Sequence, residues 1–352
     1  MRPYQMVVAN LRKLVEKVGA SGGTFLGTEV SVAETNGVSR MTARKGVNAL
    51  IAEGLVERRA GIGLFVRDKS YSGFLYKALF GNLFWDPSIR VAGAIRREAQ
   101  HVGAKVEFFD AGGDEQRFLS EIAGLPKSGA KGAIIFSSHG AAFEEAVGQL
   151  VEARFPFVVV DEFVDSDNVS SFVSDNAEGG RCAAQVLLDA GHKDLEFVGD
   201  LAADTVVERW NGFRKACQAA GVEPGCNDIR SSSRLGDWGG DVRAIAERLL
   251  KRKRLPTGIF CSCDAVARLV MRTFADRGVR VPDDVSIVGF DDDPIAEWMS
   301  PALTTIRQDF DVMGTKAFAS LISRVGDPSS APVSETIPVR MVLRASVVPP
   351  RA

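Results

Sequence analysis

Apolar positions in the first fifty residues recur at helical spacing. Six of them fall on one side of residues 3–18, which predicts an amphipathic helix: Val7, Val8, Leu11, Leu14, Val15 and Val18. Thr28 can cap a second, short helix that ends near Thr35, since Gly37 follows.

A third helix is predicted from Arg40 to about Ala52, with Ser39 as its cap and Gly54 beyond its end. Its apolar face carries Ala43, Val47, Leu50 and Ile51. Its opposite face carries Arg40, Arg44 and Lys45. Residues 55–59 and 63–68 then alternate as two strands around the glycine-rich turn 60–63.

The pattern changes at about residue 77, after a short connector at 69–76. Beyond it, short apolar runs alternate with helical stretches, and such runs predict parallel strands buried on both faces. The runs are 105–111, 132–138, 157–162, 195–200, 258–263 and 285–291. The helices are expected at 88–102, 114–124, 141–153, 176–190, 206–220, 239–253 and 265–277.

The predicted fold is α/β, with a small helical head and a large body. About 275 residues exceed one doubly wound core, so we expect two lobes with a cleft between them. The last run, 336–350, is expected to form antiparallel or edge strands. The predicted domains are therefore 1–68 and 77–352, joined by 69–76.

Charge divides the chain in the same place. The net charge is −2, but residues 1–68 hold 10 Lys/Arg against 6 Asp/Glu. A basic head on an acidic body is typical of a head that meets an anionic partner. We find no signal peptide and no apolar stretch long enough to span a membrane, so a cytoplasmic protein is expected.

Cysteine and histidine are too sparse and scattered to predict a metal site. The five cysteines form no CxxC pair, and the three histidines are far apart in sequence. We expect reduced thiols, no metal and no cofactor.

The segment 27–66 resembles the GntR-type winged helix, most specifically in VSRMTARKGVNALIAEGLVERRAGIGLFV, and the resemblance spans nearly all of residues 1–68. The resemblance implies that the third helix reads DNA through Ser39, Arg40, Thr42 and Arg44. Lys45, on the same charged face, is a further expected DNA contact. It also places Gly61 and Ile62 at the tip of the wing. Two arginines one turn apart can enter a single groove, where Arg pairs well with guanine; the alternative is a solvated charged face.

Two departures from the GntR pattern bear on specificity. Gly27-Thr28-Glu29-Val30 replaces the family's Pro-Ser-Glu-Arg-like stretch, so an arginine that often touches DNA is missing. Ile62 stands where a basic residue is common.

The body resembles the LacI-type ligand-binding domain, which shares its fold with periplasmic sugar-binding proteins. The resemblance rests on ordered motifs within 172–200, 208–221, 256–267, 281–293 and 301–314. It implies a sugar site built from polar groups and an aromatic ring at strand ends. The expected effector contacts are Asn82, Phe84, Ser137, Asp161, Arg209, Trp238 and Asp291.

Several of these residues have plain structural alternatives. Trp238 could belong to the core, and Arg209 with Asp291 could be a structural ion pair. Asp175 and Asn176 could cap a helix, and Asp264 is expected only to do so. Asp292 and Asp293 are expected to be solvated or capping, and Cys263 replaces the family's usual polar contact.

The sequence therefore predicts a DNA-binding repressor controlled by a small carbohydrate-like effector, working as a homodimer on duplex DNA. The sign of the control, induction or corepression, stays open. A binding receptor without regulatory DNA binding is the alternative. An enzyme is disfavoured because no Walker A, HExxH or strand-linked GxGxxG motif occurs.

Overall fold

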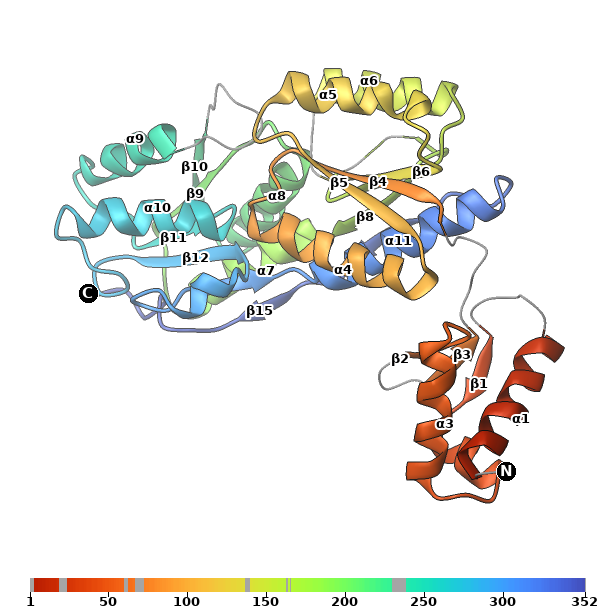
Figure 1. The fold of residues 1–352 in the computed structure, drawn as a ribbon. Coiled ribbons are helices and arrows are strands. Elements are labelled where there is room, and N and C mark those ends of the chain that lie inside the picture. The colour runs from red at the N-terminus through yellow and green to blue at the C-terminus, as the bar shows by residue number, and fades with distance from the viewer. Residues whose placement is uncertain are drawn as a thin grey trace. The chain divides into compact units, whose positions relative to one another are not determined.

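The computed structural model describes residues 3–18, 24–59, 63–66, 73–136, 140–162, 164, 166–229 and 239–351. The chain forms two compact units (Figure 1): residues 1–76 with 96–106, and residues 77–95 with 107–352. None of the helices in these ranges is long and apolar enough to cross a membrane.

The first unit begins with three helices and a small antiparallel sheet in the order β1-β3-β2. The elements are α1 Pro3–Val18, β1 Phe25–Gly27, α2 Glu29–Thr35, α3 Arg40–Ala52, β2 Val56–Arg59 and β3 Gly63–Val66. Their apolar faces share one core, in which Val7, Ala43, Val47 and Leu50 are fully buried. The three predicted helices and the hairpin are confirmed.

Both predicted helix caps are present. The Thr28 hydroxyl accepts a hydrogen bond from the Ser31 amide at 3.1 Å, and the Ser39 hydroxyl accepts one from the Thr42 amide at 3.2 Å. Strand β1 was not predicted, because three residues are too few to show an alternating pattern. It pairs with β3, and the rings of Phe25 and Phe65 lie 5.2 Å apart.

The second unit is built around two six-stranded sheets, ordered β14-β8-β7-β6-β4-β5 and β10-β9-β11-β12-β13-β15. The strands of the first sheet are β4 Leu75–Phe80, β5 Lys105–Asp110, β6 Gly132–Phe136, β7 Phe157–Val160, β8 Ser170–Ser174 and β14 Ser334–Ile337. Those of the second are β9 Leu195–Gly199, β10 Gly225–Asp228, β11 Gly258–Cys261, β12 Ser286–Asp291, β13 Thr304–Arg307 and β15 Arg340–Val342. The two lobes predicted for this region are thus present.

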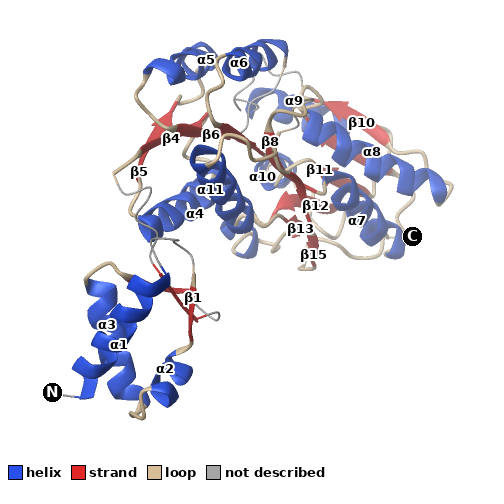
Figure 2. Ribbon diagram, turned by 90° about the vertical axis from the view of Figure 1, so that its right-hand side faces the viewer, coloured by secondary structure: helices blue, strands red, loops and turns tan. Residues whose placement is uncertain are grey.

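Helices cover both faces of each sheet (Figure 2). In the first lobe, α5 and α6 pack together on one face, and α4 and α11 lie on the other. In the second lobe, α9 and α10 cover one face and α7 and α8 the other. The helices are α4 Asp86–Val102, α5 Glu115–Gly124, α6 Ala141–Glu152, α7 Asn176–Asp189, α8 Asp204–Ala219, α9 Gly239–Leu250, α10 Asp264–Ala275 and α11 Phe310–Gly326.

Both sheets reverse their strand order next to the strand that begins each lobe. The chain passes from β4 outward to β5 and then returns to β6 on the other side of β4. It does the same from β9 to β10 and back to β11. In parallel α/β sheets, ligands bind at the carboxyl ends of strands at such a reversal.

Three features of the body differ from the sequence prediction. Helix α11 was missed, because its start at Phe310 lies within a run interpreted only as a family motif. In the tail, β15 is antiparallel as expected, whereas β14 pairs in parallel with β8. Both tail strands lie at sheet edges. Strand β4 begins at Leu75, inside the expected connector.

Glycines set the contact between α7 and α8. A Cβ on Gly180 would overlap the Arg209 carbonyl oxygen, and one on Gly212 would overlap the Ala177 carbonyl oxygen. The two backbones can therefore approach only because neither position carries a side chain.

We expect Gly180→Ala to lower the free energy of unfolding by about 1–3 kcal/mol or more, because the backbones must separate. Gly148→Ala is the matched control on the exposed face of α6, where a Cβ would meet nothing within 4 Å. That change should be neutral or stabilising by up to about 1 kcal/mol. Thermal unfolding of the two variants tests the ranking, and equal stabilities would contradict it.

Candidate functional site

The charged face of α3 has the form that the sequence predicted. Arg40 and Arg44 are exposed one helical turn apart, while Ala43 and Val47 on the opposite face are fully buried. The hydroxyls of Ser39 and Thr42 lie 2.9 Å apart at the start of the helix. This places hydroxyl and guanidinium groups on the same end of α3, where a phosphate or base edge can be contacted.

Two neighbouring cations are already engaged. The Lys45 ammonium lies 4.8 Å from the centre of the Tyr4 ring on α1. Arg58 of β2 pairs with Glu29 and donates to Asn48 at 3.0 Å. Lys45 therefore packs toward α1, while Arg40 and Arg44 are the exposed arginines on the charged face of α3. The wing residues Gly61 and Ile62 lie outside the described residues.

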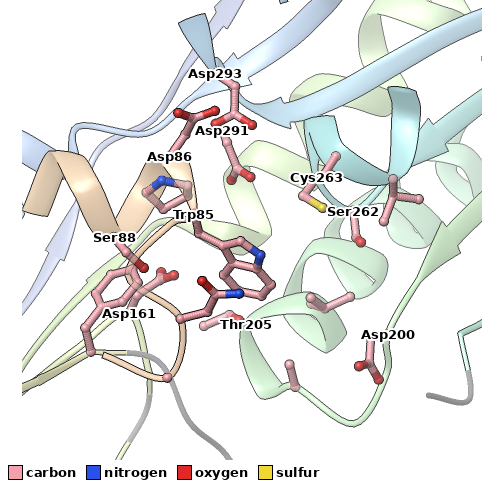
Figure 3. A pocket seen from close by; sticks show the side chains of 18 of the residues that line it. Trp85, Asp86, Ser88, Asp161, Asp200, Thr205, Ser262, Cys263, Asp291 and Asp293 are labelled. Carbon is pink, nitrogen blue, oxygen red and sulfur yellow. The ribbon is translucent and has the colours of Figure 1, made fainter. Parts of the chain in front are cut away.

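A cavity that is partly open to solvent lies between the two lobes of the second unit (Figure 3). Its lining comes from the carboxyl ends of β4, β6, β7, β9, β11 and β12 and from helices α4, α8 and α10. The polar lining residues are Asn82, Asp86, Ser88, Asp161, Glu162, Asp200, Thr205, Arg209, Ser262, Arg268, Asp291 and Asp293. The cavity thus occupies the place that the strand reversals favour for a ligand.

The first-lobe wall presents Asp161 directly after β7. Its backbone has a φ of 59°, a left-handed conformation that is uncommon for a residue with a side chain. The buried Oδ1 atom has no hydrogen-bond partner among the described residues. Burial raises the pKa of Asp161 to about 6, although the positive charge of Arg209 opposes the rise.

The opposite wall presents Asp291 at the end of β12. Its φ is 114°, and its Oδ1 atom accepts a hydrogen bond from the Gln308 side chain at 2.6 Å. Burial raises the pKa of Asp291 well above its usual range, and the Arg209 charge again opposes the shift. Both strand-end aspartates therefore carry a cost when ionised that a ligand can reduce.

Arg209 lies between these walls, where it is fully engaged with the second lobe. Its Nε donates to Asn176 at 2.7 Å and its Nη1 donates to the Ser262 carbonyl oxygen at 2.7 Å. The guanidinium carbon lies 3.8 Å from the centre of the Phe290 ring, and Nη1 lies 3.9 Å from the Asp291 carboxylate. The ion pair that the sequence suggested is thus present, and Arg209 also lines the cavity.

The structure brings five of the seven predicted effector contacts to this one cavity: Asn82, Phe84, Asp161, Arg209 and Asp291. Asn82 uses its side-chain oxygen to accept the Phe84 amide at 3.0 Å, and Phe84 is 82% exposed. Ser137 and Trp238 lie outside the described residues. The binding role of all seven stays a prediction.

Three acidic residues differ from expectation. Asp264 does not cap α10; it is 1% exposed, accepts the Asp293 amide at 2.8 Å and accepts the Thr305 hydroxyl at 2.6 Å. Asp292 is not solvated, because it pairs with Arg344 at 2.6 Å. Asp293 is 7% exposed and lines the cavity.

The capping role considered for Asp175 is confirmed, because its side chain accepts a 3.0 Å hydrogen bond from the Glu178 amide at the start of α7.

Several lining residues were missed. Asp200 directly follows β9, so the strand-end rule that selected Asp161 could have found it. Trp85, Asp86 and Ser88 lie at the start of α4. Their helix places them against the second lobe, and no short-range sequence pattern reports that contact.

Family comparison matches two segments of the chain. Residues 3–66 match bacterial regulatory proteins of the gntR family, and residues 184–347 match the periplasmic binding protein-like domain. The chain therefore joins an N-terminal segment similar to the gntR family to a larger segment similar to the periplasmic binding protein-like domain.

Curated relatives include transcriptional repressors. The chain is 31% identical over 193 residues to the HTH-type transcriptional repressor PurR of Pasteurella multocida, which is 54% of this chain and 57% of that protein. It is 32% identical over 209 residues to PurR of Yersinia pestis, or 58% and 60%. The chain thus spans rather more than half the length of these relatives.

Solved structures share the fold of the body. A LacI family regulator from Enterococcus faecium with bound ribose superposes with a TM-score of 0.69 at 23% identity, over 79% of this chain and all of that one. The regulator CelR in complex with cellobiose gives a TM-score of 0.69 at 23% identity, over 91% and 99% of the two chains.

The raised pKa of Asp161 predicts a pH-dependent stability. In the folded protein the Asp161 carboxyl keeps its proton up to about pH 6, whereas the usual pKa of an aspartate is 3.8. The folded state therefore binds more protons in this interval, and its stability falls as the pH rises through it. Asp161→Asn has no carboxyl group to ionise at this position, so the variant does not lose stability in this way as the pH rises. The stability of Asp161→Asn relative to wild type should therefore rise by about 2–3 kcal/mol between pH 4 and pH 7.

Chemical denaturation of the ligand-free proteins across this range measures the difference. Asp276→Asn, on the exposed surface of α10, is the control and should show no such trend. A stability difference between Asp161→Asn and wild type that does not change with pH would contradict the assignment.

Proposed function

We propose that this protein is a sequence-specific DNA-binding transcriptional regulator, a repressor whose operator affinity is set by a small carbohydrate-like effector. The observation that carries the proposal is one chain joining a gntR-family head to a two-lobed body with a polar cavity between its lobes. The relatives named PurR are repressors, which agrees with this assignment.

The DNA-binding part of the proposal rests on α3. Arg40 and Arg44 are exposed on one face, and Ser39 and Thr42 fix the start of the helix. Arg suits the guanine edge in the major groove, and the hydroxyls and amides at the helix start suit phosphate. We assign residues 1–68 to this DNA-binding domain, 69–76 to a linker and 77–352 to the effector-binding domain.

The effector part rests on the carboxylates and unpaired atoms in the cavity. Carboxylates accept hydrogen bonds from neighbouring hydroxyls, and a buried acceptor without a partner favours a ligand that supplies a donor. Similar folds hold ribose or cellobiose, according to the names of those structures. We infer a binding site and not a catalytic one, in a protein that works in the cytoplasm.

Control is proposed to act through closure of the two lobes. A ligand that binds the closed form better than the open form shifts the balance between them. In a homodimer, such a change alters the spacing of two DNA-reading helices, and typical coupling energies are about 1–3 kcal/mol. The competing candidate is a ligand-binding receptor without regulatory DNA binding.

Fluorescence anisotropy separates these candidates. DNA fragments from the neighbourhood of the gene are titrated with the full chain, with and without a panel of mono- and disaccharides. A regulator gives saturable binding that at least one ligand changes. Binding of a ligand with no affinity for any fragment would favour the receptor and overturn the proposal.

We expect Arg44→Ala to weaken specific operator binding by about 10–100-fold, the loss of one good base contact. Ligand binding, measured by calorimetry, should be unchanged. Lys13→Ala, an exposed charge on α1, is the matched control and should retain operator affinity. Equal losses in both variants would mean that only general charge matters and that α3 does not read the sequence.

Asp291→Ala should remove the response to ligand while leaving the affinity for operator DNA intact, because the carboxylate that faces the ligand is lost. Asp276→Ala in the same lobe is the control and should respond normally. A normal dose–response curve for Asp291→Ala would exclude the role assigned to this residue.

A further inference from the structure

The cavity between the lobes carries an excess of acidic groups. Among the described lining residues, the carboxylic acids are Asp86, Asp161, Glu162, Asp200, Asp291 and Asp293. The guanidinium groups that line it are only Arg209 and Arg268. Hydroxyl groups alone would satisfy hydrogen bonds in such a site, but they would not balance its charge.

The nearest cations are already committed to other atoms. Arg209 donates to Asn176 and to the Ser262 carbonyl while it stacks on Phe290. Arg90, on α4, donates to the carbonyl oxygens of Asp291 and Gln308 at 3.4 and 3.2 Å. Their donors are thus directed at the protein framework, so the excess of acidic groups over cations remains.

Polar atoms on both walls are buried and unpaired. The Ser88 side chain belongs to a residue that is 1% exposed, and Asp293 is 7% exposed. The Ser88 hydroxyl and the Asp293 Oδ1 atom have no hydrogen-bond partner among the described residues, and both residues line the cavity. Unpaired groups of this kind cost free energy in the empty site and favour a ligand that pairs with them.

Asp86 and Asp293 face each other from opposite lobes. Asp86 lies in the first turn of α4, and Asp293 follows β12. Figure 3 shows the Asp86 carboxylate turned toward those of Asp291 and Asp293. Burial raises the pKa of Asp293 to about 7; the charge of Asp86 adds to the rise, and the charges of Arg90 and Arg268 oppose it. When both are ionised, they repel each other across the cavity.

A cation placed between them would reverse this repulsion. A protonated amine attracts both carboxylates and donates hydrogen bonds to each. The ring of Trp85 also lines the cavity and can attract a cation through its face. A neutral hydroxyl offers the hydrogen bonds without removing the repulsion.

We propose that the effector carries a protonated aliphatic amine on a polyhydroxylated skeleton, and that this amine bridges Asp86 of the first lobe and Asp293 of the second. The inference rests on the proposed function, because it names the class of the effector. It also supplies the reason for closure: the ligand replaces repulsion between the lobes with attraction to a shared cation.

Proton release then accompanies binding. The charged amine favours the ionised form of Asp293, so its affinity increases as the pH rises through the pKa of that residue. With a pKa of about 7 in the ligand-free site, the affinity should rise about tenfold between pH 6 and pH 8. A neutral polyol should not show this rise.

Other charged and ionisable groups surround the same space. They are Arg90 and Asp86 on α4, Asp161 and Glu162 after β7, Asp200 after β9, Arg209 on α8, Cys263, Asp264 and Arg268 at the start of α10, and Asp291 and Asp292 at the end of β12. A comparison between matched ligands cancels the contributions that do not depend on the amine.

Calorimetry with the full chain tests the proposal. The probes are 6-amino-6-deoxyhexoses and 1-amino-1-deoxyhexitols, each beside the parent sugar or alditol, at pH 6 and pH 8. At pH 8, at least one amine should bind ten or more times tighter than its parent. The same amine should bind about tenfold more weakly at pH 6 than at pH 8. Asp293→Asn and Asp86→Asn should each remove most of this preference, whereas Asp276→Asn should keep it.

Parent sugars that bind as tightly as the amines at both pH values, or a panel in which no amine binds better, would overturn the amine assignment. The proposed function would stand in that case if a neutral sugar altered operator binding. Conversely, a chain that binds amines but no DNA would refute the regulator and leave the ligand class supported. Putrescine binding as tightly as the amino sugars would exclude the polyhydroxylated skeleton.

Discussion

The guanidinium of Arg209 is the interaction on which the architecture of the cavity depends. It reaches the cavity from α8 because Gly180 and Gly212 let α7 and α8 approach closely. Once there, it joins the start of α7 to the ends of β11 and β12, through Asn176, the Ser262 carbonyl and the ring of Phe290. A buried charge is tolerated only when it is paired and hydrogen-bonded, and this one is both.

The carboxylates around Arg209 are positioned by a second buried network. Asp264 holds the Asp293 amide and the Thr305 hydroxyl, so it fixes the turn that follows β12. Asp292 forms an ion pair with Arg344, whereas its neighbours Asp291 and Asp293 line the cavity. Three consecutive aspartates thus have three different environments, and two of them, Asp291 and Asp293, line the cavity.

These networks connect the chemistry of the cavity with motion of the lobes. The second-lobe carboxylates are held rigidly by the interactions just described, whereas Asp86 and Asp161 belong to the first lobe. The free energy that a ligand gains by pairing with both sets depends on how close the lobes are. Differential affinity of this kind is what allows a ligand to shift a conformational equilibrium.

The sequence by itself determined the elements that local physics controls. Apolar periodicity placed α1 and α3, the hydroxyls of Thr28 and Ser39 marked helix starts, and continuous apolar runs gave the buried strands that end at Asp161 and Asp291. Tertiary structure decided which groups meet. Asp86 and Ser88 line the cavity between the lobes. Asp264 accepts a hydrogen bond from the loop after β12 instead of capping its helix, and Asp292 forms an ion pair with Arg344. Such contacts join residues far apart in the chain, and side-chain spacing within one element carries no information about its distant neighbours.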